Sequence, residues 1–189
     1  MRFKQLIEYV DPEQAKKDIL DRVSQIDPNE EANQKLLDRI YSLLDATGVT
    51  DRLMPNLNNA LKQEYNEKAI KIIAEKIVES SRLNLQQKQK FLDNLSKDKC
   101  VNSELLNKIG HYSLSDLFYN STENYQMFVE FLGYGVGQKR AGKGEHALAI
   151  LSQKITQQGK GDITVDGTAV ELKVAEKKGS GRLGEGGVS

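Results

Sequence analysis

Residues 161–174 read GDITVDGTAVELKV, and this stretch decides the fold of the C-terminal part of the chain. Asp166-Gly167 stands between two short runs rich in β-branched residues, a pattern that predicts a β-hairpin with a two-residue type I′ turn. Such a turn fixes the register of the strands, so Asp162 is predicted to face Glu171. Because side chains alternate along a strand, one face is predicted to be aliphatic. The other face carries Asp162, Thr164, Ala169, Glu171 and Lys173.

The predicted register makes Asp162 and Glu171 direct cross-strand neighbours, with Cβ atoms roughly 4.5–5.5 Å apart. Like charges at this separation destabilise a hairpin unless they are compensated, and Lys173 on the same face compensates in part. Mg²⁺ would compensate better, because it prefers hard oxygen ligands, usually one or two carboxylates with water and phosphate oxygens. The hairpin therefore predicts a site for a metal and a phosphate. The alternative is a surface cluster of ion pairs worth about 0–1 kcal/mol.

The residues before the hairpin predict a buried helix. Residues 145–155, EHALAILSQKI, are apolar at helical spacing, with Glu145 in the first turn. An acidic residue is favoured there by the helix dipole alone. A strand between this helix and the hairpin is expected to be a short piece near residues 154–156, or absent.

Asp162, followed by Glu171-Leu172-Lys173 at the end of a hairpin, resembles the D…(D/E)-x-K signature of the PD-(D/E)XK nuclease superfamily, which includes restriction endonucleases. The resemblance implies an α-β-β-β-α-β core in which the first helix supplies a further acid, a position that Glu145 matches. It implies that Asp162 and Glu171 hold one or two Mg²⁺ ions, for which Mn²⁺ can substitute, and that Glu145 contributes to metal binding directly or through water. Lys173 would position the attacking water and stabilise charge on the phosphate.

The chain departs from this superfamily in two places. Gly161 precedes Asp162, where the superfamily's name has proline. Sixteen residues follow Lys173, too few and too rich in glycine for the helix and strand that complete the core. We therefore expect a truncated module, or one that a partner completes.

Composition divides the 189 residues into two regions. Thirteen of the fifteen glycines lie from Gly133 onward, and from Tyr134 onward nine basic and six acidic residues give a net charge of +3 in a chain whose overall net charge is zero. We expect an α+β protein with a helical bundle over residues 1–132, a basic Gly-rich linker over 133–142 and a partial nuclease-like module over 143–189. In the bundle, helices are predicted to start at Asp11-Pro12 and Asp27-Pro28, with Asp as the N-cap. Gly48 is expected to end the second helix, and further helices are predicted over about 58–81, 85–96, 102–109, 113–119 and 123–132.

Several function classes are excluded or made improbable by composition. One cysteine, Cys100, excludes an internal disulfide framework or a cysteine-based zinc cluster. No stretch approaches the roughly 18 apolar residues of a membrane span. The N-terminal residues lack a secretion signal, so we expect a cytoplasmic protein. If a phage encodes the chain, we expect it in the host cytoplasm or in the virion. Zero net charge excludes a bulk polycation but allows local basic contacts with nucleic acid. The residues considered for such contacts are Lys139, Arg140, Lys143, Lys160, Lys177, Lys178 and Arg182.

These patterns favour a Mg²⁺-dependent DNA endonuclease, encoded by a phage or mobile element. One alternative is a non-catalytic structural or assembly protein, such as a virion component, that uses a nuclease-like module for interaction. Another is a nucleic-acid-binding protein that does not cleave. The helical domain is the expected site of contact with a second copy or a partner protein.

Overall fold

The computed structural model describes residues 11–25, 29–108, 112–132, 143–157 and 162–171. These residues form nine helices and one three-stranded sheet, so the fold belongs to the α+β class, as predicted. The helices are α1 (Pro12–Val23), α2 (Glu30–Ala46), α3 (Val49–Leu53), α4 (Asn59–Glu79), α5 (Leu85–Ser96), α6 (Ser103–Leu106), α7 (Leu114–Leu117), α8 (Thr122–Phe131) and α9 (Lys143–Leu151); the strands are β1 (Ile155–Gln157), β2 (Ile163–Val165) and β3 (Thr168–Val170). Within the described ranges no helix is long and apolar enough to cross a membrane.

Side-chain caps set the starts of the main helices. Asp11 caps α1 as predicted, because its carboxylate accepts a hydrogen bond from the Glu13 N–H at 3.1 Å. Asn58 caps α4, and Asn84 caps α5 through a reciprocal capping box with Gln87. These bonds satisfy N–H groups that have no partner inside the helix.

The predicted start of the second helix was wrong. Asn29, two residues after Asp27, caps α2 by accepting a hydrogen bond from the Ala32 N–H at 3.2 Å. Asn and Asp are about equally good caps, so residue type could not choose between them. Gly48 follows the end of α2 with a left-handed φ of 60°, as expected of a helix stop. The short helix α3 that comes next was not predicted.

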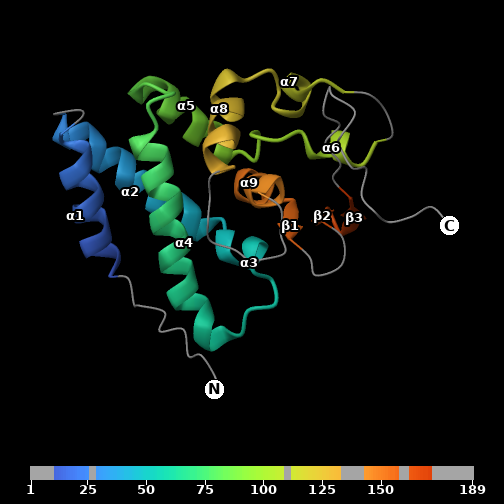
Figure 1. Cartoon of the computed structure of the whole chain (residues 1–189), viewed down its shortest axis with the longest axis horizontal. Coiled ribbons are helices and arrows are strands. Elements are labelled where there is room, and N and C mark those ends of the chain that lie inside the picture. Colours follow the sequence, from blue (N-terminus) through green and yellow to red (C-terminus); the bar gives the residue numbers. More distant parts are fainter. Residues whose placement is uncertain (1–10, 26–28, 109–111, 133–142, 158–161, 172–189) are drawn as a thin grey trace.

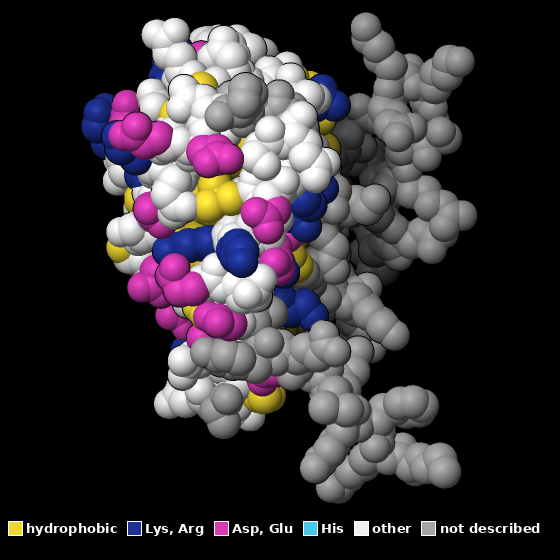
Figure 2. All heavy atoms as spheres, turned by 90° about the vertical axis from the view of Figure 1, so that its left-hand side faces the viewer, with side chains coloured by type: hydrophobic (Ala, Val, Ile, Leu, Met, Phe, Trp, Pro, Cys, Tyr) yellow, Lys and Arg dark blue, Asp and Glu magenta, His cyan; other side chains and the backbone are white. Residues whose placement is uncertain are grey.

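Helix α4 is central to the bundle, where it packs against α1, α2, α3 and α8 (Figure 1). Its Ile73, Ala74 and Ile77 are fully buried. The end of the molecule that carries α1, α2 and α4 shows acidic and basic side chains interleaved on its surface (Figure 2). Ion pairs link these helices, as Arg22 of α1 does with Glu75 at 2.9 Å and Glu79 at 2.7 Å. The described side chains of this face therefore form no continuous basic patch.

Helix α9 is buried along most of its length. It packs against α8, α3 and β1, and every residue from Ala147 to Leu151 is at most 4% exposed. These side chains belong to the same hydrophobic core as those of α2, α4 and α5. The change in composition near residue 133 is therefore not a break in the core. The predicted linker itself, 133–142, lies outside the described residues.

The sheet is a meander in the order β1-β2-β3, with both pairs antiparallel. Ile155 begins β1, so the short first strand expected near residues 154–156 is present, whereas the predicted helix ends at Leu151 instead of continuing to Ile155. Figure 1 shows the hairpin at the end of the molecule opposite α1. This order, one helix followed by three antiparallel strands, places the candidate site at the sheet.

Candidate functional site

The register of the β2–β3 hairpin is the predicted one. Ile163 pairs with Val170, Thr164 with Ala169, and Val165 with Thr168. Asp166 and Gly167 form the turn with φ values of 48° and 82°, both left-handed as a type I′ turn requires. The next positions outward from the Ile163–Val170 pair are those of Asp162 and Glu171, so the hairpin brings these two carboxylates to the same end.

The two carboxylates differ in exposure. Asp162, directly before β2, is half-buried, whereas Glu171, directly after β3, is exposed. Carboxylate oxygens from one half-buried and one accessible side chain fit the hard-oxygen, partly hydrated coordination of Mg²⁺. Asp162 and Glu171 could therefore hold such an ion with water and phosphate oxygens completing its shell.

The face that carries Asp162 is less open than its polar sequence predicts. Thr164, two residues along on this face, is 5% exposed, and its hydroxyl has no hydrogen-bond partner within the described part of the chain. Ala169 opposite is exposed. All three residues of β2 are buried, so β2 is buried on both faces, and the accessible part of this face is confined to its Asp162–Glu171 end and to β3.

The other candidate residues are placed as follows. Glu145 lies in the first turn of α9 and is half-buried. Lys143 is the first residue of α9. Within the described ranges no three His, Cys, Asp or Glu side chains form a group that could hold a metal ion, so Glu145 does not join the two hairpin carboxylates in such a group. The remaining candidates lie outside the described residues: Lys173, Lys139, Arg140, Lys160, Lys177, Lys178 and Arg182.

A buried arginine holds α9 against the bundle. Arg52 of α3 is 6% exposed, and its Nε donates to the Ala149 carbonyl of α9 at 3.0 Å. A second guanidinium N–H donates to the Thr47 carbonyl. Burial lowers the pKa of Arg52 to about 10, which leaves the guanidinium charged at neutral pH. The nearby carboxylates of Asp98 and Asp51 oppose this lowering of the pKa, and the two carbonyls accept hydrogen bonds from the guanidinium.

Two further contacts fix the turn from α9 into the sheet. The Asp98 carboxylate, at the end of α5, accepts a hydrogen bond from the Gln153 N–H at 2.8 Å. Gln157 of β1 is buried, and with its amide oriented to satisfy both ends it donates to the Leu53 carbonyl at 2.8 Å and accepts from the His146 N–H at 3.1 Å. Helix α3, helix α9 and strand β1 are therefore joined by polar contacts as well as by packing.

Sequence reasoning missed Arg52, Asp98 and Gln157 as supports of the site. Each bonds to a partner far along the chain, with separations of 97 residues for Arg52 to Ala149 and 55 for Asp98 to Gln153. Nothing local in the sequence marks such residues. An internal arginine next to Leu53 is the one weak signal, because a charged residue inside an apolar segment needs a buried partner.

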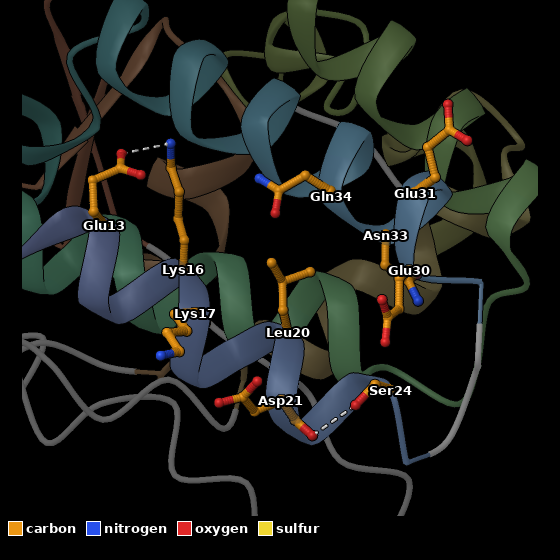
Figure 3. A pocket seen from close by; sticks show the side chains of 10 residues that line it. All are labelled: Glu13, Lys16, Lys17, Leu20, Asp21, Ser24, Glu30, Glu31, Asn33 and Gln34. Atoms are coloured by element: carbon orange, nitrogen blue, oxygen red, sulfur yellow. Dashed lines mark hydrogen bonds and ion pairs between the residues drawn. The ribbon is translucent and has the colours of Figure 1, made fainter.

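A cavity of about 590 Å³ lies between α1 and α2, away from the hairpin (Figure 3). Charged and amide side chains surround Leu20 there. The cation of Lys16 pairs with Glu13 at 3.1 Å and with Asp38 at 3.2 Å, and lies 5.2 Å from the centre of the Tyr41 ring. Because the Lys16 cation is already paired with Glu13 and Asp38, this cavity is a weaker candidate for the functional site than the hairpin.

Comparison of the chain with protein-family models, with curated proteins and with solved structures finds no match. The functional assignment therefore rests on the hairpin and its surroundings.

Proposed function

We propose that this chain hydrolyses phosphodiester bonds in DNA with Mg²⁺ as its metal ion, and that Asp162 and Glu171 are the metal ligands. The observation that carries the proposal is the hairpin register, which aligns these two carboxylates at one end of the sheet. An acid directly opposite another acid destabilises a hairpin unless a cation lies between them or beside them. The order α9-β1-β2-β3 supports the proposal, since it matches the first part of the core of the nuclease superfamily that the motif resembles.

In the proposed reaction, water adds across a P–O bond: its oxygen bonds to phosphorus, and the leaving oxygen takes up a proton. Bound Mg²⁺ supplies positive charge to the phosphoryl oxygen and lowers the pKa of a bound water. Asp162 and Glu171 orient that cation, and Asp162 is held in place by its position next to the buried strand β2. In the motif, Lys173 positions the water and stabilises the charge that develops on the phosphate. Glu145, in the first turn of α9, would contribute to metal binding directly or through water.

Plasmid nicking tests the proposal. Supercoiled DNA is incubated with the intact chain and Mg²⁺, Mn²⁺ or EDTA, and the variants Asp162→Asn and Lys173→Ala are compared with Asp166→Asn. Asp166→Asn is the matched control, because it removes a carboxylate from the exposed turn of the same hairpin, where Asn fits the left-handed φ. We expect metal-dependent nicking by the wild type and the control, and none by the other two.

Circular dichroism of each variant establishes that it is folded. Nicking that survives Asp162→Asn, or that persists in EDTA, contradicts the assignment. A folded wild-type chain that does not cut with either metal favours the alternative of a non-catalytic assembly protein. The nucleic-acid-binding alternative is indicated if that inactive chain still binds DNA in EDTA.

A further inference from the structure

Exposed aromatic side chains gather around α7 and the start of α8. Among the described residues five large hydrophobic side chains are exposed, and four of them lie between residues 112 and 125. These four, which we call the tyrosine patch, are Tyr112 (45% exposed), Leu114 (50%), Tyr119 (50%) and Tyr125 (38%). In Figure 1, α7 lies at the same end of the molecule as the β2–β3 hairpin. A concentration of this kind on one surface typically marks a binding site.

A hollow of about 310 Å³ opens within the tyrosine patch. Its lining combines one aromatic ring and one leucine side chain with hydroxyl and amide groups: Leu114, Ser115, Asn120, Ser121, Thr122 and Tyr125. An apolar wall beside a few convergent hydrogen-bonding groups suits a flat heteroaromatic ligand, which stacks on the ring and bonds along its edge. A nucleobase has both properties, and it offers them only when it is unpaired.

Contacts within the chain hold one ring of the patch and the backbone beside it. The Tyr125 ring lies 5.9 Å, centre to centre, from the fully buried ring of Phe118. Tyr119 and Asn120 both have left-handed φ values, 52° and 54°, and the Asn120 N–H donates to the Ser115 carbonyl at 2.8 Å. The Tyr125 ring is therefore already in contact with the core, and the backbone at Tyr119 is fixed, so less conformational freedom remains to be lost when a ring stacks there, which favours binding.

Lysines next to the patch favour a nucleic acid over a protein as its ligand. The segment after α5 runs beside the patch: Asn124 donates from its amide to the Lys99 carbonyl at 3.0 Å and to the Phe118 carbonyl at 3.4 Å. The side chain of Lys99 is exposed and makes no ion pair within the described part of the chain. Two acids lie next to this contact in sequence: Glu123 is neutralised by Lys90 at 3.0 Å, and the Asp98 carboxylate, beside Lys99, accepts a hydrogen bond from the Gln153 N–H at 2.8 Å.

A second exposed lysine continues from the patch toward the hairpin. Lys154 follows Gln153, whose N–H bonds to Asp98, the neighbour of Lys99. The Lys154 carbonyl accepts a hydrogen bond from the Asp166 N–H in the hairpin turn at 3.0 Å. Strand residues are about 3.3 Å apart, so Asp162 lies roughly 13 Å further along the strand from that turn. Aromatic rings beside unpaired cations are the combination that binds single-stranded nucleic acid.

We propose that the tyrosine patch binds an unpaired nucleobase of a single-stranded segment, with Tyr119 and Tyr125 as stacking surfaces and Lys99 and Lys154 as phosphate contacts. This inference rests on the proposed function and makes its substrate more specific. The DNA that reaches the hairpin is then single-stranded or locally unpaired.

The test measures binding and leaves cleavage out. Fluorescence anisotropy in EDTA is used to titrate the intact chain into a labelled single-stranded DNA, its RNA counterpart and the corresponding DNA duplex. We expect single strands to bind more tightly than the duplex, and the DNA and RNA arms show which sugar the site prefers. Tyr119→Asn, which keeps a residue that tolerates a left-handed φ, and Tyr125→Ala are each expected to weaken binding roughly 5- to 100-fold. Leu61→Ala on α4 removes an exposed apolar side chain outside the patch and should leave binding unchanged.

The lysines give a second readout that a folding defect would not imitate. Loss of one phosphate contact in Lys99→Ser should reduce the slope of log affinity against log salt by about 0.7. Lys35→Ser is its control, because Lys35 is an exposed lysine on α2 paired with Glu31. Equal binding by Tyr119→Asn and the wild type, or equal affinity for duplex and single strand, overturns the proposal. So does an absence of single-strand binding together with a Tyr125-dependent change in solution mass, which would make the patch a protein interface.

The two proposals fail separately. Asp162→Asn is expected to bind single strands like the wild type in EDTA while losing nicking. Tyrosine-dependent binding by a chain that never cuts would retain the base site and reject the nuclease. Nicking by a chain that does not bind single strands would retain the nuclease and reject the base site.

Discussion

Replacement of the buried Arg52 by methionine is expected to lower the free energy of unfolding by about 2–4 kcal/mol. The substitution keeps a long, flexible side chain and removes the donors that reach the Ala149 and Thr47 carbonyls. A buried acceptor left without a partner costs about 1–3 kcal/mol. The bond to Ala149 is buried and the bond to Thr47 is partly buried, so together they set the upper part of the range, and the avoided desolvation of the guanidinium charge reduces it.

The matched control is Arg22→Met. Arg22 also makes two polar contacts, with Glu75 and Glu79, but its side chain is 49% exposed. Ion pairs of this kind contribute about 0–1 kcal/mol. Replacement of arginine by methionine is therefore expected to lower the free energy of unfolding slightly at Arg22 of α1 and strongly at Arg52 of α3.

Thermal unfolding followed by circular dichroism measures both variants. For a chain of this length each kcal/mol corresponds to a Tm change of about 2–4 °C, so Arg52→Met should lower Tm by roughly 4–16 °C. Arg22→Met should change it by less than about 4 °C. Equal Tm values for the two variants would refute the reasoning, since burial would then not distinguish them. If unfolding proves irreversible, urea midpoints give the same comparison.

Three further outcomes follow from buried or constrained groups. Gly167→Ala should lower the free energy of unfolding in urea by about 1–2 kcal/mol, because φ is 82° at this position and alanine is strained there. Since no atom lies within 4 Å of an added Cβ, no steric clash adds to this cost. Asp166→Asn should leave the free energy of unfolding nearly unchanged. Cys100 is fully buried, and burial raises the pKa of its thiol well above 9.0, so a disulfide reagent at mildly alkaline pH should label it only after denaturant is added; fast labelling of the native chain would contradict its placement. Burial alone would raise the pKa of Glu123, but hydrogen bonds from its own N–H, Lys90 and Ser121 hold it below 4.5. Stability from this carboxylate is therefore complete above about pH 5 and is lost as pH falls through the lowered pKa, so Glu123→Gln should cost about 1–2 kcal/mol at neutral pH and less in acid; a difference that does not depend on pH would count against the ion pair.

The hairpin could be predicted from sequence because its determinants are local. A two-residue turn with Asp-Gly leaves one register, and alternation along four residues on each side then decides which side chains share a face. The same holds for the start of α1 at Asp11-Pro12, where the cap and the first helical residue are adjacent in sequence. Local chemistry also predicts the helices whose apolar spacing continues over several turns, such as α4.

The end of α9 could not be predicted in this way. Ile155 continues the apolar spacing of the helix, yet the chain turns after Leu151, where the Gln153 N–H bonds to Asp98, a residue that follows α5 and is distant in sequence. The burial of Thr164 on the polar face of the hairpin is likewise not visible in the alternation of the strand. For the candidate site, sequence predicts the alignment of Asp162 and Glu171 but not the contacts through Arg52 and Gln157 that support it.

The long separation between Arg52 and Ala149 has a consequence for synthesis of the chain. A ribosome adds about 5–20 residues per second, and 97 residues separate the two partners, so α3 is made roughly 5–20 s before the helix that covers it. During that interval α3, with Val49 and Leu53, can pack against α4 but not yet against α9 and β1. The nascent chain therefore presents an apolar surface beside a solvated cation, which chaperones and proteases can recognise until α9 has left the ribosome.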